Sequence, residues 1–247
     1  MDRVAPAIAL FATVAMAAGS ACSVAVESTE PEAESQPACG VEEDVLVQER
    51  FARPADQWPA AWTAFGVGAS WVEPGSGFLL AGPGARHGRK LTAPLAPTDT
   101  LIQFSFSPTE PQSFVVSLYG DQPRGRSAEV SVTRRFDAFG RASVEGLVES
   151  GPAHIPMTDE QPEDGATPRD RSAGRWWLRI RVRRESGGDY IGARLWRDGT
   201  AEPERFDEVR ADGLASLGTF GLEAREHRDS WSDDAVELHS VTLCKSR

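Results

Sequence analysis

Apolar and polar side chains alternate at every second position in segment after segment of this chain, and this alternation restricts its fold more than any other feature. The clearest case is residues 176–184, where two sets alternate: Trp176, Leu178, Ile180 and Val182 with Trp177, Arg179, Arg181 and Arg183. Successive side chains of a β-strand point to opposite faces, whereas a helix would mix the two sets. The pattern therefore predicts strands with one buried face and one exposed face.

Turn-forming segments separate these strands at short intervals. Each contains glycine, and they comprise residues 73–77, 137–140, 185–189 and 197–199. Glycine and aspartate favour the turns that connect antiparallel strands. About eleven or twelve segments meet the strand criteria and no amphipathic helix is evident, so the sequence predicts an all-β, antiparallel two-sheet sandwich. Residues 151–174 are Pro-rich and charged, and are predicted to form a long loop that is either functional or disordered.

The N-terminal region predicts export. The apolar stretch of residues 4–18 follows Arg3 and ends in Gly19, Ser20 and Ala21, an order typical of a secretory signal and too short to span a bilayer. We therefore expect residues 1–21 to be a signal peptide. Residues 22–39 are rich in Glu, Ser and Pro and predict an acidic disordered tether. Residues 40–247 are expected to form one folded domain.

The segment Gly19-Ser20-Ala21-Cys22 resembles a bacterial lipoprotein cleavage box, in which small residues precede the cysteine that becomes the lipidated N-terminus. The resemblance implies that Cys22 carries a lipid that anchors an outer-membrane or cell-surface protein. The chain departs from the pattern at Gly19, where the family prefers Leu. Ordinary signal-peptidase cleavage near Ser20 or Ala21 therefore stays open, and would give a periplasmic or secreted protein.

The other two cysteines predict a disulfide. With Cys22 lipidated, Cys39 and Cys244 remain as one even pair in an oxidising compartment. Cys39 precedes the first strand-like segment and Cys244 lies in the last one. A sandwich that pairs its terminal strands would bring the two together. Metal binding is the weaker alternative, because neither cysteine belongs to a CxxC motif or a Cys/His cluster.

The charge balance argues against a nucleic-acid partner. The chain has 26 Lys and Arg against 37 Asp and Glu, a net charge of −11. An acidic domain repels a polyphosphate unless its basic residues are segregated, and here they are scattered. Hydrophobic residues make up 40% of the chain, enough to build a sizeable core.

Three regions resemble the concanavalin A-like lectin/glucanase superfamily, whose lectin, glucanase and laminin-G-like domains are jelly-roll sandwiches. These are residues 51–62 with Trp71, Gly77 and Leu79-Leu80; residues 176–182 and 191–199 with Glu202-Pro203; and residues 217–224 with 236–243. The resemblance implies an antiparallel two-sheet jelly roll whose last strand pairs near the first. It also implies a concave sheet, on which the glycan-binding members of the superfamily bind their ligands.

One predicted hairpin presents a candidate ligand face. The residues expected to share this face are Trp177, Arg179, Arg181, Tyr190, Arg194 and Trp196. Aromatic rings cover the apolar faces of pyranoses, and guanidinium groups hydrogen-bond to hydroxyls or carboxylates. We therefore predict a non-catalytic module that binds a polysaccharide or other glycan. The alternative is structural, with the tryptophans packed beneath the long loop and covered by arginine stems.

Catalytic motifs are not evident. Glucanases of the superfamily carry a Glu-x-Asp-x-Glu strand that this chain lacks, although Glu145 and Glu149 share a predicted face. Remote carboxylates can still converge, so a glycoside hydrolase acting on a polysaccharide or disaccharide is one alternative. A structural or protein-interaction module of the cell envelope is another. The four histidines show no HxH or HExxH spacing and no Gly-x-Ser-x-Gly elbow occurs, which disfavours zinc or serine hydrolase chemistry.

A calcium site is the one cofactor that the resemblance implies. Asp229, Asp233 and Asp234 surround Trp231 in a predicted loop. Their carboxylates are hard oxygen ligands, and laminin-G-like domains often bind calcium at a sandwich edge. The alternative is a hydrophilic turn.

Overall fold

The structure, a computed structural model, describes residues 39, 45–51, 57–95, 98–106, 112–120, 127–136, 138, 142–157, 174–211, 217–226 and 235–245. The chain divides into residues 1–34 and residues 35–247, and all described residues belong to the second unit. The predicted signal peptide, Cys22 and the tether up to residue 38 lie outside the described residues, so they stay predictions. Within the described residues, no helix is long and apolar enough to cross a membrane.

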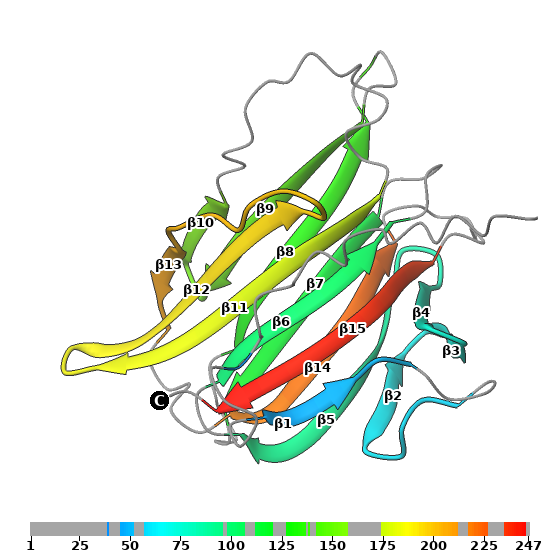
Figure 1. Cartoon of the computed structure of the whole chain (residues 1–247), viewed down its shortest axis with the longest axis horizontal. Helices are drawn as coiled ribbons and strands as arrows, with labels where there is room; N and C mark the ends of the chain where they lie inside the picture. Colours follow the sequence, from blue (N-terminus) through cyan, green and yellow to red (C-terminus); the bar gives the residue numbers. More distant parts are fainter. Residues whose placement is uncertain are drawn as a thin grey trace, which may run out of the picture. The chain divides into compact units, whose positions relative to one another are not determined.

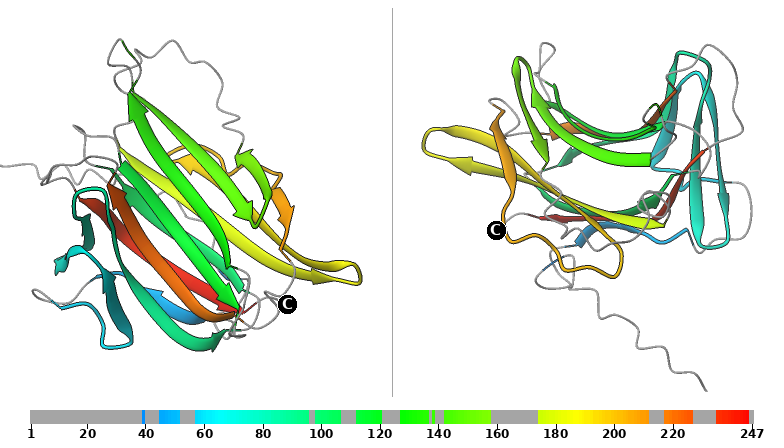
Figure 2. Two further views of the ribbon diagram at one scale, coloured as in Figure 1. Left: turned by 180° about the vertical axis from the view of Figure 1, so that it is seen from behind. Right: turned by 90° about the horizontal axis from the view of Figure 1, so that it is seen from above.

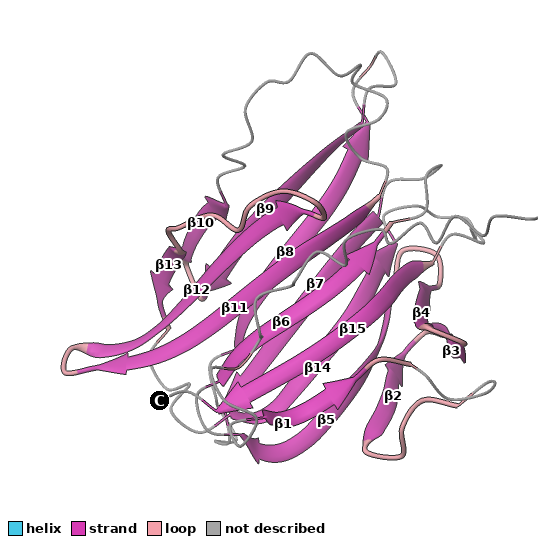
Figure 3. Cartoon of the chain, viewed as in Figure 1, coloured by secondary structure: helices cyan, strands magenta, loops and turns pink. Residues whose placement is uncertain are grey.

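In the described part of the chain, fifteen strands make up two antiparallel sheets (Figures 1 and 3). Sheet A contains β1 (Val45–Glu49), β3 (Gly68–Glu73), β4 (Ser76–Ala81), β6 (Thr98–Ser105), β11 (Arg175–Glu185), β12 (Gly188–Arg197), β13 (Asp207–Arg210) and β15 (Val236–Lys245). Sheet B contains β2 (Trp62–Gly66), β5 (Arg86–Leu95), β7 (Gln112–Gly120), β8 (Ser127–Phe136), β9 (Ala142–Ser150), β10 (Ala153–Met157) and β14 (Leu217–Glu226). The all-β prediction is confirmed.

The strand order places the last strand inside sheet A. The order is β13-β12-β11-β6-β15-β4-β3 in sheet A and β10-β9-β8-β7-β14-β5-β2 in sheet B. One edge of β15 pairs with β6, and the other pairs first with β4 and then with β1. The register sets Val45 opposite Cys244, so the first and last strands are neighbours as the resemblance implied.

The two sheets lie face to face and bury alternate side chains between them (Figure 2). On β11, Trp176 is 3% exposed and Leu178 is 0% exposed, as the alternation predicted. Each such side chain stabilises the fold by about 1.5–3 kcal/mol relative to an exposed position, an upper estimate because unfolded chains also bury some surface. Aromatic rings contact one another within the core, as Trp62 and Phe220 do edge to face with centroids 6.2 Å apart.

The structure contains more strands than the sequence predicted. β10 lies within residues 151–174, which were expected to be a loop, and β13 follows the β11–β12 hairpin. Pro156 interrupts the polar–apolar pattern of β10, and proline cannot donate a hydrogen bond within a sheet. It is accommodated because β10 is an edge strand of sheet B.

The predicted disulfide is present between Cys39 and Cys244, whose Cα atoms are 5.6 Å apart. It connects residues separated by 205 positions and ties the chain before β1 to the end of β15. Disulfides of this kind are typical of oxidising compartments, which agrees with the predicted export.

We expect the double substitution Cys39→Ser/Cys244→Ser to lower the free energy of unfolding by about 2–5 kcal/mol, because the unfolded chain gains freedom when a long loop is opened. Urea denaturation followed by tryptophan fluorescence would measure the loss, with the reduced wild type as a matched control. An unchanged unfolding midpoint, or alkylation of both cysteines in the folded protein without reductant, would contradict the prediction.

Candidate functional site

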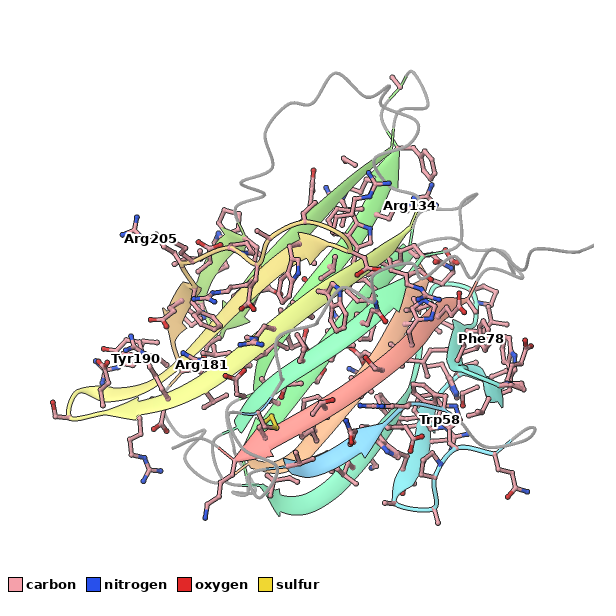
Figure 4. The ribbon with its side chains drawn as sticks, viewed as in Figure 1. Trp58, Phe78, Arg134, Arg181, Tyr190 and Arg205 are labelled. Carbon is pink, nitrogen blue, oxygen red and sulfur yellow. A yellow bond between two sulfur atoms is a disulfide. The ribbon has the colours of Figure 1, made fainter. Side chains whose placement is uncertain are left out.

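The residues of the predicted ligand face come together on the outer face of sheet A. They lie on β11 and β12, where the register pairs Trp177 with Trp196, Arg179 with Arg194, and Arg183 with Tyr190. The two indole rings are stacked with centroids 6.3 Å apart. Arg181 and Tyr190 project from the same hairpin (Figure 4). The ligand-binding role of this face stays a prediction.

Acidic side chains of the chain itself contact the arginines of this face. Arg181 donates a hydrogen bond to Asp99 of β6 at 2.7 Å. Arg194 donates to Glu202 at 2.7 Å, and the same carboxylate lies 3.3 Å from Arg179. These guanidinium groups are therefore already engaged in ion pairs within the domain.

The segment between β12 and β13 covers part of the same face. The guanidinium carbon of Arg194 lies 3.9 Å from the ring centroid of Phe206, and that of Arg181 lies 4.6 Å from it. Trp196 is 7% exposed and Arg179 is 9% exposed. The contacts favour the structural interpretation of this face. Among the described residues, the cover comes from residues 202–206. Residues 158–173 of the predicted long loop lie outside the described residues.

A hollow of about 470 Å³ lies on the outer face of sheet B. Figure 2 (right) shows this sheet curved, with its hollow side turned away from sheet A. The lining combines hydroxyl, charged and apolar side chains, among them Ser113, Ser131, Thr133, Arg135, Glu145, Arg225, Val115, Leu147, Pro156 and Met157. On β7 and β8 these residues alternate with core residues such as Phe114 and Val132, as a two-faced strand requires.

Sequence reasoning considered only Glu145 and Glu149 on this face. Glu145 lines the hollow and lies 3.5 Å from Arg135, whereas Glu149 is set opposite Glu129 across β8 and β9. The signal that could have identified the hollow is the run of hydroxyl side chains at alternate positions of β7 and β8. It was missed because such residues are also ordinary on a solvated strand face.

Arg225 connects two glutamates beside the hollow. Its side chain donates a hydrogen bond to Glu129 of β8 at 2.8 Å and another to Glu223 at 2.8 Å. Glu223 has no exposed side-chain surface. It sits opposite Gly88 of β5, where an added Cβ would lie 2.8 Å from the Glu223 Cβ. Glycine at this position therefore allows β14 to approach β5 closely at Glu223.

Burial raises the pKa of Glu223 above its ordinary value, while Arg225 and Arg86 act in the opposite direction. Burial also acts to lower the pKa of Arg225, but Glu223 and Glu129 outweigh it and the pKa is raised. Arg225 is thus held as a cation between two acidic groups. Removing either Glu129 or Glu223 would therefore leave the positive charge of Arg225 without one of its two partners.

Other acidic residues lie away from the hollow or outside the described residues. Glu208 of β13 accepts a hydrogen bond from Arg183 at 2.6 Å, which raises the pKa of that arginine. Asp229, Asp233 and Asp234 lie outside the described residues, so the calcium site stays a prediction. In the part of the chain that the structure describes, no three His, Cys, Asp or Glu side chains are grouped to hold a metal ion.

We expect Glu223→Gln to change how stability depends on pH. The folded protein holds the Glu223 proton more tightly than the unfolded chain does. This group therefore contributes stability below its ordinary pKa, and the contribution is lost as the pH rises through the raised value. Glutamine carries no charge, so the free energy of unfolding of the variant should rise relative to that of the wild type as the pH increases from 4.5, the ordinary pKa of the group, toward neutrality.

Urea denaturation at several pH values measures this difference. Glu145→Gln is the matched control, because Glu145 is 58% exposed in a surface pair with Arg135 and exposed pairs contribute little. A constant offset between Glu223→Gln and wild type across the range would contradict the prediction.

Comparison by sequence finds no match to a known family: neither the models of protein families nor the curated proteins match this chain. Comparison of the structure does find similar folds. The "CBM2 module of Lactobacillus casei BL23 phage J-1 evolved Dit" is 14% identical, has a TM-score of 0.52, and the match covers 81% of this chain and 94% of that one. Peanut lectin, determined with a nine-residue peptide, is 11% identical with a TM-score of 0.50, and the match covers 80% of this chain and 96% of the lectin.

At this level of identity the likeness concerns the fold alone. It agrees with the two antiparallel sheets. The described domain has the jelly-roll fold of the concanavalin A-like lectins.

Proposed function

We propose that this chain is an exported, lipid-anchored, non-catalytic module that binds a polysaccharide in the hollow of sheet B. The observation that carries the proposal is the lining of the hollow. It combines hydroxyls, both signs of charge and an apolar floor in one volume of about 470 Å³, within the range typical of ligand pockets.

The chemistry of the lining suits a sugar. Pyranose rings present hydroxyls around their edge and apolar C–H groups on their faces. Ser131, Arg135 and Glu145 offer donors and acceptors for the hydroxyls, whereas Leu147 and Pro156, which are set opposite each other on β9 and β10, offer apolar contact. The similar folds include a CBM2 module and a plant lectin, which supports a carbohydrate as the ligand.

The hollow is a better candidate than the predicted face of sheet A. On sheet A, the guanidinium groups of Arg179, Arg181 and Arg194 are already paired with acidic residues of the chain itself. A ligand that binds there would first have to displace these ion pairs. Leaving a buried charge unpaired costs about 3–5 kcal/mol.

Hydrolysis of a glycoside is the second candidate, because Glu129 and Glu223 bind the same nitrogen of Arg225 and so lie close together. Two neighbouring carboxyls are what glycoside hydrolysis requires. A catalytic acid must also reach the scissile bond, and Glu223 has no exposed side-chain surface. Binding without hydrolysis is therefore the function that we favour.

Export and a lipid anchor complete the proposal. The disulfide between Cys39 and Cys244 supports an oxidising compartment. The signal-like residues 1–21 and the lipoprotein-type segment ending at Cys22 support a membrane anchor at the N-terminus, and the domain would face outward from it.

The hollow can be tested by filling it. We expect the wild type to be retarded in affinity electrophoresis by at least one polysaccharide identified on a glycan array. Ser131→Phe places a bulky ring in the lining without disfavouring a strand. We expect it to weaken binding at least tenfold, about 1.4 kcal/mol. Trp177→Ala, on the outer face of sheet A, should bind as the wild type does.

The same experiment distinguishes the alternatives. Loss of binding in Trp177→Ala with retention in Ser131→Phe would move the site to sheet A and contradict the proposal. Absence of retention with every glycan would contradict carbohydrate binding altogether. Release of reducing ends from a bound polysaccharide, abolished in Glu129→Gln, would establish the hydrolase instead.

The lipid anchor has its own test. Expressed in a bacterial host, the wild type should partition into membranes with a lipidated Cys22 as its N-terminal residue, found by mass spectrometry of the N-terminal peptide. Cys22→Ala should instead be found in the soluble exported fraction. A wild-type N-terminus with an unmodified Cys22 would contradict lipidation while leaving the sugar-binding proposal untouched.

A further inference from the structure

A bulge in β15 gathers four polar side chains on the outer face of sheet A. The β15–β6 register shifts between Leu238 and Ser240, which are set opposite Phe104 and Gln103. His239 is the extra residue of this bulge. A bulge re-aims a side chain, and here the ring of His239 lies beside Glu237, Ser76 of β4 and Ser105 of β6.

The contacts of His239 resemble those of a general base. Its Nε2 lies 3.1 Å from Ser105 Oγ, and its Nδ1 lies 3.4 Å from Ser76 Oγ and 3.6 Å from Glu237 Oε1. Ser76 Oγ donates to Glu237 Oε1 at 2.6 Å, so it can accept from His239. An Nδ1–H tautomer satisfies these contacts and leaves Nε2 as an acceptor facing Ser105.

We propose that Ser105, His239 and Glu237 form a nucleophile–base–carboxylate triad that transfers acyl groups from carboxylic esters. Such triads are recognised by the roles and distances of their members and occur in any order along a chain. The proposed activity is independent of sugar binding in the hollow, because the three residues lie on the opposite sheet.

The electrostatic surroundings keep His239 able to accept a proton. Burial lowers the pKa of His239, and the positive charge of Arg175 lowers it further. The negative charges of Glu237 and Asp198 act to raise this pKa, but the net shift is downward. The imidazole is therefore neutral at neutral pH. The single proton of the Ser105 hydroxyl can be donated either to His239 Nε2 or to Glu237 Oε2, each 3.1 Å away, so a rotation of the hydroxyl selects the base.

Neighbouring side chains provide the other parts of an ester site. Arg175 is exposed and lies directly opposite Ser105 across β6 and β11, so a cation shares the face of the serine, and a cation stabilises the negative charge that develops on an ester carbonyl oxygen. Phe78 of β4 lies directly opposite Glu237 and stacks on Trp71 with centroids 5.0 Å apart. Phe78 is labelled in Figure 4, and this aromatic pair offers a wall for an apolar acyl group.

The reaction balances with water as the second substrate. Ser105 Oγ forms a bond to the ester carbonyl carbon while His239 Nε2 takes the hydroxyl proton. The bond from that carbon to the alcohol oxygen breaks, and His239 returns the proton to the departing alcohol. Water then attacks the acyl-serine through the same base, so that a carboxylic acid is released and Ser105 regains its proton.

A fluorophosphonate probe tests the nucleophile directly, because an activated serine displaces fluoride and keeps the phosphonyl group. With the purified full chain, we expect one adduct, located on Ser105 by peptide mass spectrometry, and turnover of p-nitrophenyl acetate. Ser105→Ala should abolish both. His239→Asn should slow labelling and turnover by about 10²–10⁴, the usual contribution of a general base.

Matched controls separate catalysis from folding. Ser240→Ala removes the serine of β15 that follows His239 and lies opposite Gln103, and His154→Asn removes an exposed histidine of β10. Both should label and turn over as the wild type does, and all variants should retain its far-ultraviolet circular dichroism. Absence of an adduct on Ser105 in the wild type, or equal labelling rates in folded His239→Asn and wild type, would overturn the proposal.

Discussion

Burial of every second side chain between two antiparallel sheets is the constraint on which the rest of this structure depends. The central strands turn one face toward the core. The core side chains Leu178, Phe114 and Leu222 are completely buried there. Because the side-chain period of a strand is two, a slip of one residue would exchange the core face for the outer face. The register that positions each outer side chain is therefore enforced by the core. The disulfide between Cys39 and Cys244 adds a covalent tie across the first and last strands.

The outer faces of the two sheets are organised differently because different chain segments meet them. On sheet A, Phe206 and Glu202 cover the arginines of β11 and β12, so that charge is neutralised within the domain. On sheet B, the curvature leaves a hollow lined by β7, β8, β9, β10 and β14. The arginines of β11 therefore have a structural role, whereas the hydroxyl side chains of β7 and β8 line the better candidate for a ligand site.

Two candidate activities are placed on opposite sheets. The hollow of sheet B combines Arg225, Arg135 and Glu145 with hydroxyl and apolar groups, which suits a saccharide. The bulge of β15 brings Ser105 and His239 into contact on sheet A. Both depend on the shared core for their geometry, but neither includes a residue of the other. Substitutions in one should therefore leave the chemistry of the other intact.

The sequence by itself determined the all-β class, the core face of β11 and the pairing of Cys39 with Cys244, because period-two alternation and cysteine parity can be read along the chain. The resemblance to lectin-like sandwiches added the jelly-roll topology. Only the tertiary structure decided which outer side chains meet. Arg225 and Glu129 are 96 residues apart, and Ser105 and His239 are 134 apart. Such contacts depend on strand order, register and a bulge, which arise from how the sheets pack and leave no local pattern in the sequence.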